Sequence, residues 1–596
     1  MYIILFAVLL FGFSFRIATS GAFSPFRQDE ELLRQFSAWK TDGVNVPAPE
    51  GPPVCAVYRS GDTASQNIQE QLERVLAYMK RPIRSFDVAR ETPDPAGCEA
   101  VIASVRSLEQ LGDPGRLAAY VENGGSFMIT LPPETNDAFY QWYRKLGIVN
   151  FGRYGNKPGV ELTGNVLIGE TGLRIEGETF TNWSLEVELD PESRLLVRSG
   201  DGNPLLWDRA YGRGKVMVFN GTMLESKASR GLFAGAVSML VPDFLYPVFG
   251  SKVVFLDDFP APLRPGTTED IFNLYKRDIP AFIREIWWPD MLRMAQQYDL
   301  VYTAVLIQTY NNRVEPPFEG PVDEDVRGLA TFGREVLRGG GEIGLHGYNH
   351  QSLENRRSVY DYNVWPGVEP MRESVEEALR HLRRAFPDYR PLTYVPPSNV
   401  LSPAGREALK QAWPDLAVIA SLYVEDAQNI AYVQEFEMAP DGIAEMPRVT
   451  TGYGENAYFR WVEANVITLH GFFSHFIHPD DVLDPERNHG ESWERLRERF
   501  AEDMARLRRT HPWLKAVGAA EAAADMVRTL TGRLVLKREG PVLRAEWEAE
   551  PAGTADFILR TGRTPIRTEG ATADRIDEGV YLVRTGSARF AIEWED

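Results

Sequence analysis

Two short groups of residues carry side chains that together could perform hydrolysis at a metal ion. Asp257 and Asp258 follow the apolar run Val253–Leu256, and His346-Gly-Tyr-Asn-His350 follows a second strand-like run. One carboxylate and two imidazoles fill three corners of a tetrahedral zinc site and leave the fourth open for water. The other carboxylate is then free to accept a proton from that water. The pattern therefore predicts a metal-dependent hydrolase.

Histidine is rare in this chain and unevenly placed. There are 8 histidines among 596 residues, and none precedes residue 346. Five of them fall within residues 346–350 and 470–478, the second group being His470, His475 and His478. A single histidine is more often a core or surface group than a ligand. His-x-x-x-His at one strand end, with Asp-Asp at another, is typical of metal sites on barrel folds.

These side chains need a scaffold that brings strand ends together, and strands and helices alternate around them. The candidate strands are Val253–Asp257, Val301–Ile307, Glu342–Leu345, Thr393–Val395, Leu416–Ile419 and Val466–Leu469. Alternation of this kind predicts a parallel (β/α) barrel, closed or nearly closed, over residues 249–530. The proposed ligands fall at strand ends, where such barrels carry their active sites.

Two further domains flank the barrel, and the whole chain is assigned to the α/β class. Residues 54–248 also alternate, which predicts a doubly wound α/β sandwich. Its layout resembles the glutamine-amidotransferase-like fold, but it contains no histidine and so lacks the Cys–His pair of that chemistry. We interpret it as a structural or carbohydrate-contacting domain. Residues 531–596 hold short alternating runs that predict a small β-sandwich.

The first 53 residues predict an export signal and a linker. Residues 1–20 contain a largely apolar stretch that is short for a membrane span and typical of a signal peptide, with a retained anchor as the alternative. Either interpretation places the protein outside the cytoplasm. Residues 21–53 are polar and end in a proline cluster, which predicts a tether.

Composition narrows the choice of partners. The chain has 44% hydrophobic and 25% charged residues, which is typical of soluble globular proteins. A formal net charge of -20, with no cluster of Lys and Arg, argues against a nucleic-acid partner. Cys55 and Cys98 are the two cysteines, and in an exported chain they permit one disulfide. Two buried free thiols are the equal alternative.

The barrel region resembles the polysaccharide deacetylase family over roughly residues 250–525. Phe255-Leu-Asp-Asp258 is similar to the family's first motif, which implies that Asp257 is the general base and Asp258 a metal ligand. His346-Gly-Tyr-Asn-His350 matches the second motif, which implies that both histidines are ligands. The implied cofactor is a divalent metal ion, and zinc is favoured.

Two other motifs depart from the family pattern. Tyr394-Val-Pro-Pro-Ser398 stands where the family has an Arg-Pro-Pro loop, which implies substrate contacts by Pro397 and Ser398. The arginine of that loop is absent, and Arg448 is the candidate to supply the guanidinium from elsewhere. The gap between the first and second motifs is also long, which implies an insertion.

The general acid of the family is a histidine, and three compete for that role here. Ile467-Thr-Leu-His470 is the best local match to the family's last motif. His475 and His478 precede Asp480-Asp481, an arrangement similar to larger exopolysaccharide deacetylases of the Pel type. We favour His475 or His478 as the acid and retain His470 as a candidate.

The resemblance implies an enzyme that removes N-acetyl groups from an extracellular amino-sugar polysaccharide. An exopolysaccharide of the kind found in biofilms is favoured, with export machinery as a partner. Trp288 and Tyr348 lie near expected strand-end loops and are predicted to contact sugar rings, with core packing as the alternative for each.

Two other functions stay open. A metal-dependent glycoside hydrolase needs two carboxylates that flank the scissile bond, whereas Asp257 and Asp258 are adjacent. A non-catalytic glycan-binding or scaffold protein is the second alternative, and the missing arginine of the Pro-Pro loop favours it.

Overall fold

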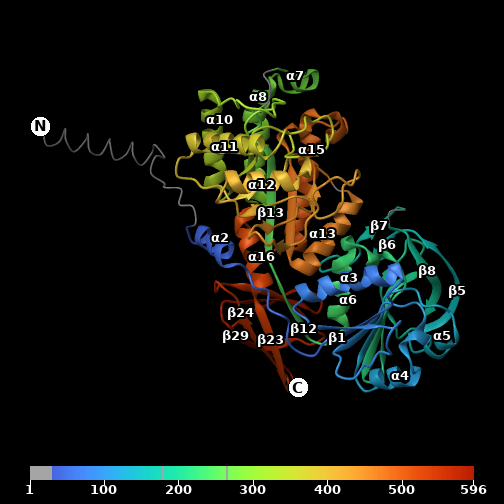
Figure 1. Ribbon diagram of the computed structural model, residues 1–596. Coiled ribbons are helices and arrows are strands. Elements are labelled where there is room, and N and C mark those ends of the chain that lie inside the picture. Colours follow the sequence, from blue (N-terminus) through green and yellow to red (C-terminus); the bar gives the residue numbers. More distant parts are fainter. Residues whose placement is uncertain (1–29, 178–179, 263–265, 455, 596) are drawn as a thin grey trace, which may run out of the picture.

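The molecule consists of an N-terminal α/β domain, a central half-barrel and a C-terminal β-sandwich (Figure 1). This computed structural model describes residues 30–177, 180–262, 266–454 and 456–595. The predicted signal peptide or anchor, residues 1–20, lies outside the described residues. Within the described ranges, no helix has the length and apolar character to cross a membrane.

The segment predicted as a tether, residues 21–53, contains a helix. α2 (Glu30–Asp42) buries Phe36 and Trp39, which share one face, and packs against α16 (Ala519–Thr531). The prediction of a free linker is therefore wrong for this helix, because its apolar face fixes it to the half-barrel.

The N-terminal domain is built on a nine-stranded sheet of order β2-β1-β3-β4-β11-β10-β9-β6-β7. The pairs from β2 to β11 are parallel, and the remaining pairs are antiparallel. The strands are β1 (Val54–Tyr58), β2 (Ile83–Asp87), β3 (Ala100–Ala103), β4 (Ser126–Ile129), β6 (Val160–Leu162), β7 (Arg174–Ile175), β9 (Arg194–Arg198), β10 (Pro204–Tyr211) and β11 (Gly214–Phe219). A separate antiparallel pair is formed by β5 (Ile148–Lys157) and β8 (Asn182–Leu189).

Helices cover both faces of this sheet. Successive side chains of a strand point to opposite faces, so Val54 and Ala56 join one core cluster and Cys55 and Val57 the other. The first cluster includes side chains of two helices, α3 (Thr63–Tyr78) and α6 (Arg230–Leu240). The second includes side chains of α4 (Pro114–Glu122) and α5 (Asp137–Trp142).

The central sheet has the order β18-β19-β17-β16-β15-β14-β13-β21-β20, with β22 paired to β13. Its strands are β13 (Ser251–Phe259), β14 (Tyr302–Ile307), β15 (Glu342–Gly347), β16 (Thr393–Tyr394), β17 (Val418–Ile419), β18 (Glu437–Met438), β19 (Ala444–Glu445), β20 (Thr450–Thr451), β21 (Phe472–Ile477) and β22 (Lys515–Ala516). All pairs are parallel except β18 with β19. The sheet is a half-barrel, less complete than the closed or nearly closed barrel that the alternation predicts.

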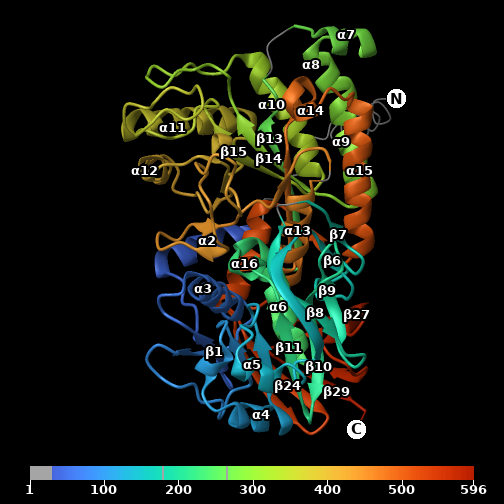
Figure 2. The same ribbon diagram turned by 90° about the vertical axis from the view of Figure 1, so that its right-hand side faces the viewer.

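The half-barrel's helices lie outside its sheet (Figure 2). They are α7 (Glu269–Tyr275), α8 (Ile279–Phe282), α9 (Trp288–Tyr298), α10 (Asp323–Arg338), α11 (Val368–Ala385), α12 (Pro403–Ala412), α13 (Ala457–His470), α14 (Pro485–Asn488), α15 (Trp493–Thr510) and α16. The long interval between the two metal-ligand motifs is filled by α7 to α10 and β14.

One predicted strand, Val466–Leu469, is part of helix α13. Asn456 caps the start of this helix, and Gly471, with a φ of 58°, ends it. Every residue from 460 to 470 is buried, so the sequence shows no polar face. A continuous apolar run does not distinguish a buried helix from a buried strand. The strand is the next element, β21.

The C-terminal sandwich consists of two four-stranded antiparallel sheets, β12-β25-β28-β27 and β23-β24-β29-β26. Its strands are β12 (Phe244–Val248), β23 (Arg533–Glu539), β24 (Val542–Glu548), β25 (Ala555–Arg560), β26 (Pro565–Glu569), β27 (Thr572–Asp577), β28 (Val580–Thr585) and β29 (Arg589–Trp594). Strand β12 precedes the half-barrel in sequence and pairs with β25, Leu245 opposite Leu559. The predicted domain boundary at residue 248 is therefore wrong, because residues 244–248 belong to the sandwich.

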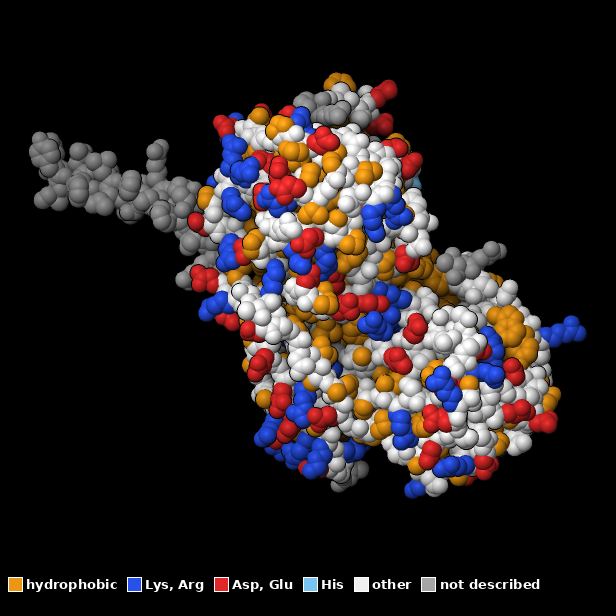
Figure 3. All heavy atoms as spheres, in the orientation of Figure 1, with side chains coloured by type: hydrophobic (Ala, Val, Ile, Leu, Met, Phe, Trp, Pro, Cys, Tyr) orange, Lys and Arg blue, Asp and Glu red, His pale blue; other side chains and the backbone are white. Residues whose placement is uncertain are grey.

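The N-terminal domain and the half-barrel share one continuous hydrophobic core. Helix α6 packs directly on α13, where a Cβ at Gly231 would overlap the carbonyl oxygen of Asn465. Hydrophobic side chains are visible in the waist between the upper and lower parts of the molecule (Figure 3). The two domains are thus fixed against each other.

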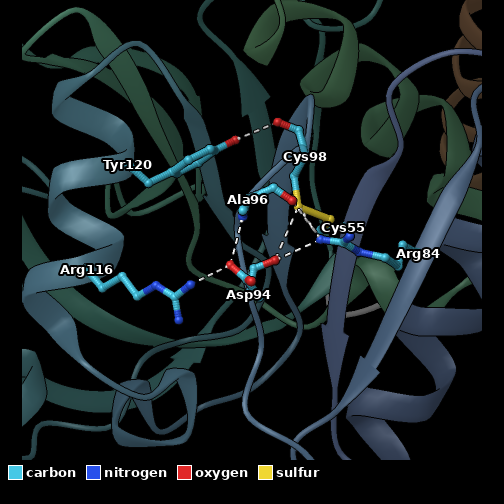
Figure 4. Close-up of a disulfide and its surroundings, with 7 residues drawn as sticks. All are labelled: Cys55, Arg84, Asp94, Ala96, Cys98, Arg116 and Tyr120. Carbon is cyan, nitrogen blue, oxygen red and sulfur yellow. Dashed lines mark hydrogen bonds and ion pairs between the residues drawn. A yellow bond between two sulfur atoms is a disulfide. The ribbon is translucent and has the colours of Figure 1, made fainter.

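A disulfide links Cys55 on β1 with Cys98, which precedes β3 (Figure 4). Strands β1 and β3 are paired neighbours, so the bridge joins adjacent parts of one sheet. The alternative of two free thiols is wrong.

Reduction of this disulfide should lower the free energy of unfolding by about 2–4 kcal/mol, because the cross-link restricts the unfolded chain. Urea unfolding with and without reductant measures the change. The double variant Cys55→Ala/Cys98→Ala is the control, and reductant should leave its midpoint unchanged. Equal midpoints for oxidised and reduced wild-type protein would contradict the expectation.

Candidate metal centre

Asp258, His346 and His350 bring their ligand atoms within 4.8 Å of one another. Asp258 Oδ1 lies 3.5 Å from Nε2 of His346 and 3.8 Å from Nε2 of His350. Asp258 Oδ1 and His346 Nε2 are buried and have no hydrogen-bond partner among the described residues. Buried polar atoms are normally satisfied. This group could therefore hold a metal ion, and its carboxylate and two imidazoles suit zinc.

A backbone irregularity places both aspartates at the same end of the sheet. Successive side chains of a regular strand point to opposite faces. Asp258 has a φ of 56°, and the pairing of β13 with β14 shifts between Leu256 and Phe259. Aspartate is among the residues that tolerate this left-handed conformation. As a result, the charges of Asp257 and Asp258 both act on His346.

Hydrogen bonds fix the orientation of the two imidazoles. His346 Nδ1 lies 2.8 Å from the carbonyl oxygen of Val395, which can only accept, so this nitrogen carries the proton and Nε2 is left with a lone pair. His350 Nδ1 lies 2.8 Å from the Tyr362 hydroxyl, which is 2.9 Å from Ser398 Oγ. Burial lowers the pKa of each histidine to about 4. Both rings are therefore neutral at pH 7, the form that binds metals.

Asp257 is held as a carboxylate beside this group. Its Oδ2 accepts a hydrogen bond of 2.6 Å from Nη1 of Arg448. Burial opposes ionisation, but the charges of Arg448 and of nearby histidines lower the pKa of Asp257 below its ordinary value. Its Oδ1 is buried and without a hydrogen-bond partner in the described part of the chain. This oxygen is suited to accept a proton.

Arg448 stands between β19 and β20, where the sequence predicted a replacement for the missing arginine. It is buried, and its guanidinium lies 3.9 Å from the centre of the Phe476 ring. Its Nη2 donates to Oδ1 of Asn399, a residue that follows the Pro-Pro-Ser sequence and that sequence reasoning missed. The Arg448 guanidinium therefore connects the Pro-Pro loop to Asp257.

Of the three histidines considered for the acid, His478 is the one that the structure places beside Asp257. Its Nε2 lies 3.6 Å from Asp257 Oδ2, and its Nδ1 lies 3.2 Å from Asp481 Oδ1. Burial opposes protonation of the ring, but Asp481 and Asp257 raise the pKa of His478 to about 9. Arg487 in turn donates to Asp481 at 2.7 Å. His478 is thus protonated at neutral pH.

The other two histidines lie elsewhere, so their predicted catalytic roles are wrong. His470 ends helix α13 at the opposite end of β21, about 20 Å of strand away from His478. Its ring packs against Tyr78 and Phe436, each with centroids 4.5 Å away. His475 Nε2 donates to the Gly452 carbonyl at 2.9 Å, and its Nδ1 lies 2.8 Å from Thr450 Oγ1. The His470 ring serves packing, and the His475 ring serves local hydrogen bonding.

Two predicted substrate contacts, Trp288 and Tyr348, are buried core residues. The Trp288 indole donates to Glu335 at 2.5 Å, and its ring packs against Phe259. The Tyr348 hydroxyl accepts hydrogen bonds of 3.1 Å from the Asn311 side chain and the Glu319 backbone, so it fastens a loop. The prediction of sugar contacts is therefore wrong for both, and core packing is the correct alternative.

The Pro-Pro loop supports the site from one side. Pro397 is buried, and its carbonyl accepts from Ser352 at 2.8 Å. Ser398 is half-buried with a φ of 51°, and its hydroxyl reaches Tyr362 beside His350. Ser398 therefore contacts the proposed ligand His350 indirectly, through the Tyr362 hydroxyl. Its predicted contact with substrate stays a prediction.

Tyr310 is a further residue of the site that sequence reasoning missed. Burial and the neighbouring carboxylates of Asp258 and Asp480 raise its pKa well above the ordinary value. Its hydroxyl is buried next to the Asp258 carboxylate. The available signal was its position just after β14, at the end of the sheet that carries the site.

Replacement of His346 by alanine should abolish metal binding, because it removes the imidazole that its Val395 hydrogen bond directs at Asp258. Zinc per chain, measured by elemental analysis after dialysis, should fall from one to near zero. His381→Ala, which removes a buried histidine on α11, is the matched control and should retain one ion per chain. Full occupancy in His346→Ala would contradict the ligand assignment.

Comparison with solved structures gives low overall similarity. A candidate polysaccharide deacetylase from Mycobacterium smegmatis aligns with 15% identity and a TM-score of 0.31, over 48% of this chain and 94% of that one. A candidate ThuA-like protein from Bacteroides uniformis aligns with 11% identity and a TM-score of 0.26, over 33% of this chain and 96% of that one. An exo-β-1,4-mannosidase from Opitutaceae bacterium strain TAV5 aligns with 14% identity and a TM-score of 0.24, over 32% and 36%. The chain therefore spans about a third of that mannosidase's length.

Sequence comparison gives one clear result. No curated protein matches the chain. The sequence profile of a bacterial family described as "uncharacterised protein conserved in bacteria (DUF2194)" matches residues 180–582. This region is more than half of the chain and includes Asp257, Asp258, both proposed histidine ligands and His478. The chain belongs to the DUF2194 family.

Proposed function

We propose that this protein is a metal-dependent deacetylase that removes N-acetyl groups from an extracellular amino-sugar polysaccharide. One observation carries the proposal. An ionised carboxylate, Asp257, and a protonated imidazole, His478, lie 3.6 Å apart beside the buried group of Asp258, His346 and His350. A base and an acid in fixed opposite protonation states are what hydrolysis of an amide requires.

The chain's own residues account for the proton movements. Asp257 accepts a proton from the attacking water while Arg448 holds its other oxygen. The oxygen of that water bonds to the acetyl carbon, and the C–N bond breaks. His478 gives its Nε2 proton to the departing sugar amine, and Asp481 stabilises the charged ring beforehand. The products are acetate and a free amino sugar.

A divalent ion held by Asp258, His346 and His350 supplies Lewis-acid chemistry at the acetyl carbonyl when bound. The neutral imidazoles and the unsatisfied ligand atoms support this assignment. Zinc is the favoured ion for such a ligand set.

The two alternatives have less support. A non-catalytic scaffold was favoured by the missing arginine of the Pro-Pro loop, but Arg448 supplies a guanidinium to Asp257. A glycoside hydrolase needs two free carboxylates on either side of a bond. Asp257 is paired with Arg448, and Asp258 faces two histidines. This arrangement fits a base and a ligand better.

We also propose that the protein works outside the cytoplasm, with an exopolysaccharide as substrate and export machinery as its partner. The Cys55–Cys98 disulfide supports this location, because disulfides persist in oxidising compartments.

Metal content and acetate release test the proposal together. Purified protein should contain one ion per chain and release acetate from N-acetylhexosamine oligomers, and a chelator should abolish both, because the acid–base pair alone lacks the Lewis acid. Restoring zinc to the chelated protein should restore release. Stoichiometric metal with no release from any acetylated substrate would favour a glycan-binding scaffold. Absence of metal would overturn the proposal.

A further inference from the structure

Trp183 differs from every other tryptophan of this protein. The structure describes all thirteen tryptophans, and twelve of them are buried. Trp183 is 38% exposed. Of the thirteen indoles, that of Trp183 is therefore the one that a ligand in solution can contact most readily.

Trp183 lies at the edge of a cavity of about 520 Å³ in the N-terminal domain. This volume is in the range of ligand pockets. The other lining residues are Arg106, Pro132, Glu134, Thr135, Asn136 and Tyr154. Four of them, Pro132, Glu134, Thr135 and Asn136, follow β4, and Arg106 follows β3. Ligands of parallel α/β sheets bind at the carboxyl ends of the strands, which is where these loops start.

The aromatic part of the cavity is held rigidly. The rings of Trp183 on β8 and Tyr154 on β5 are stacked with centroids 4.6 Å apart and an angle of 3°. The Tyr154 hydroxyl donates to the Pro133 carbonyl at 2.6 Å. The Arg106 guanidinium lies 5.0 Å from the Trp183 ring centre. A surface fixed before binding loses little conformational entropy when a ligand arrives.

The polar groups of the cavity include both donors and acceptors. Arg106 forms no ion pair with any carboxylate of the described chain, and its Nη1 is shielded and without a hydrogen-bond partner there. Glu134 is exposed at the same cavity and supplies an acceptor. One cation next to one carboxylate is a poor site for a phosphate or another strong anion. A neutral ligand rich in hydroxyl groups satisfies both kinds of group.

We propose that this cavity binds a sugar ring of a polysaccharide chain, at a second site separate from the metal centre. The C–H groups of the ring pack against the exposed part of the Trp183 indole, and its hydroxyl groups bond to Arg106 and Glu134. Strands β5 and β8, which carry Tyr154 and Trp183, lie away from α8, α10 and α11 of the half-barrel (Figure 1). The site would hold the polymer while another part of it reaches the metal centre. The inference rests on the proposed function for the choice of polymer.

The exposure of a single tryptophan provides a direct test. Acrylamide quenches exposed indoles preferentially, so the accessible part of the protein's fluorescence should come from Trp183. The probes are oligomers of N-acetylglucosamine and of N-acetylgalactosamine at millimolar concentration, added to the Asp257→Asn variant so that no turnover occurs. We expect at least one probe to protect Trp183, so that acrylamide no longer quenches the accessible part of the fluorescence. Arg106→Gln should weaken this protection about tenfold, as loss of a central polar contact does.

Two variants control the measurement. Trp183→Phe should remove the accessible fluorescence with or without probe. This result would show that the accessible fluorescence comes from Trp183. Tyr140→Ala removes another exposed aromatic residue, outside the cavity, and should leave protection unchanged. Unchanged quenching with every probe would overturn the inference, as would equal protection in Asp257→Asn proteins with and without Arg106→Gln, at matched circular dichroism.

The outcome separates this inference from the proposed function. Acetate release by the unmutated protein, with no probe protecting Trp183, would leave the deacetylase assignment intact and remove the second site. Protection of Trp183 by oligomers that are never deacetylated would support the second site and argue against the deacetylase assignment.

Discussion

Asp257→Asn is expected to lower kcat by about 10²–10⁴-fold, the range that a general base contributes, while the protein keeps its metal ion. The amide has nearly the shape of the carboxylate, but it cannot take up the proton of the attacking water. The three ligand side chains are unchanged, so metal content should stay at one ion per chain. Acetate release from N-acetylhexosamine oligomers and elemental analysis of the same samples measure both quantities.

Arg448→Met is the companion experiment for this base. Loss of the guanidinium leaves Asp257 buried without its 2.6 Å partner, and burial alone raises the pKa of a carboxyl. The acidic limb of the pH–rate profile should then move to higher pH, whereas Asp257→Asn should lose activity at every pH. If Asp257→Asn stays fully active, Asp257 is not the base.

His478→Gln is expected to lower kcat by a similar factor of about 10²–10⁴, because the departing amine then leaves without a proton. In the unmutated protein the pKa of His478 is raised to about 9, so the acid is charged below that pH and loses its proton above it. Turnover should therefore fall as pH rises through about 9. That alkaline limb should be absent from the residual activity of His478→Gln.

His475→Gln is the matched control, since it changes the same side chain three residues earlier in sequence. His475 bonds to Thr450 and Gly452 and lies away from Asp257, so this variant should lose stability and keep most of its turnover. A large loss of kcat in His475→Gln, with His478→Gln unaffected, would reverse the assignment of the acid.

Sequence reasoning singled out the group that could hold a metal ion because its signal is chemical and local. Asp257-Asp258 and His346-x-x-x-His350 are rare residues at short spacings, directly after apolar runs that do form strands. The ends of parallel strands meet at one edge of a sheet, so two motifs almost 90 residues apart could be brought together without knowing the structure between them.

The sequence could not single out His478, the proposed acid, from the other two histidines, because the periodicity that distinguishes a helix from a strand is lost when every residue is buried. All of residues 460–470 are buried. An element without a polar face shows neither the helical nor the strand periodicity of hydrophobic residues, so its type cannot be predicted from that pattern. Interpreting 466–469 as a strand put His470 at a strand end, whereas the helix puts it at the far end of β21. The ion pair of His478 with Asp481 becomes visible only when the turn after β21 is known.

The substrate contacts were the weakest predictions for a related reason. Aromatic residues near loops are as often core as surface, and sequence position alone did not distinguish buried Trp288 from exposed Trp183. Strand β12 was assigned to the domain that precedes it, because its pairing with β25 joins segments far apart in sequence and leaves no local signal.

Strand β12 also affects how the chain can reach this structure. Its pairing of Leu245 with Leu559 joins segments more than 300 residues apart, so this contact forms only after nearly the whole chain has been synthesised. Until then the edge of β12 presents unpaired backbone groups, a template for aggregation. Contacts between residues so far apart in sequence slow folding. A protein truncated before residue 533 would keep every residue of the candidate metal centre and yet leave this edge permanently open, so a soluble fragment should retain the sandwich.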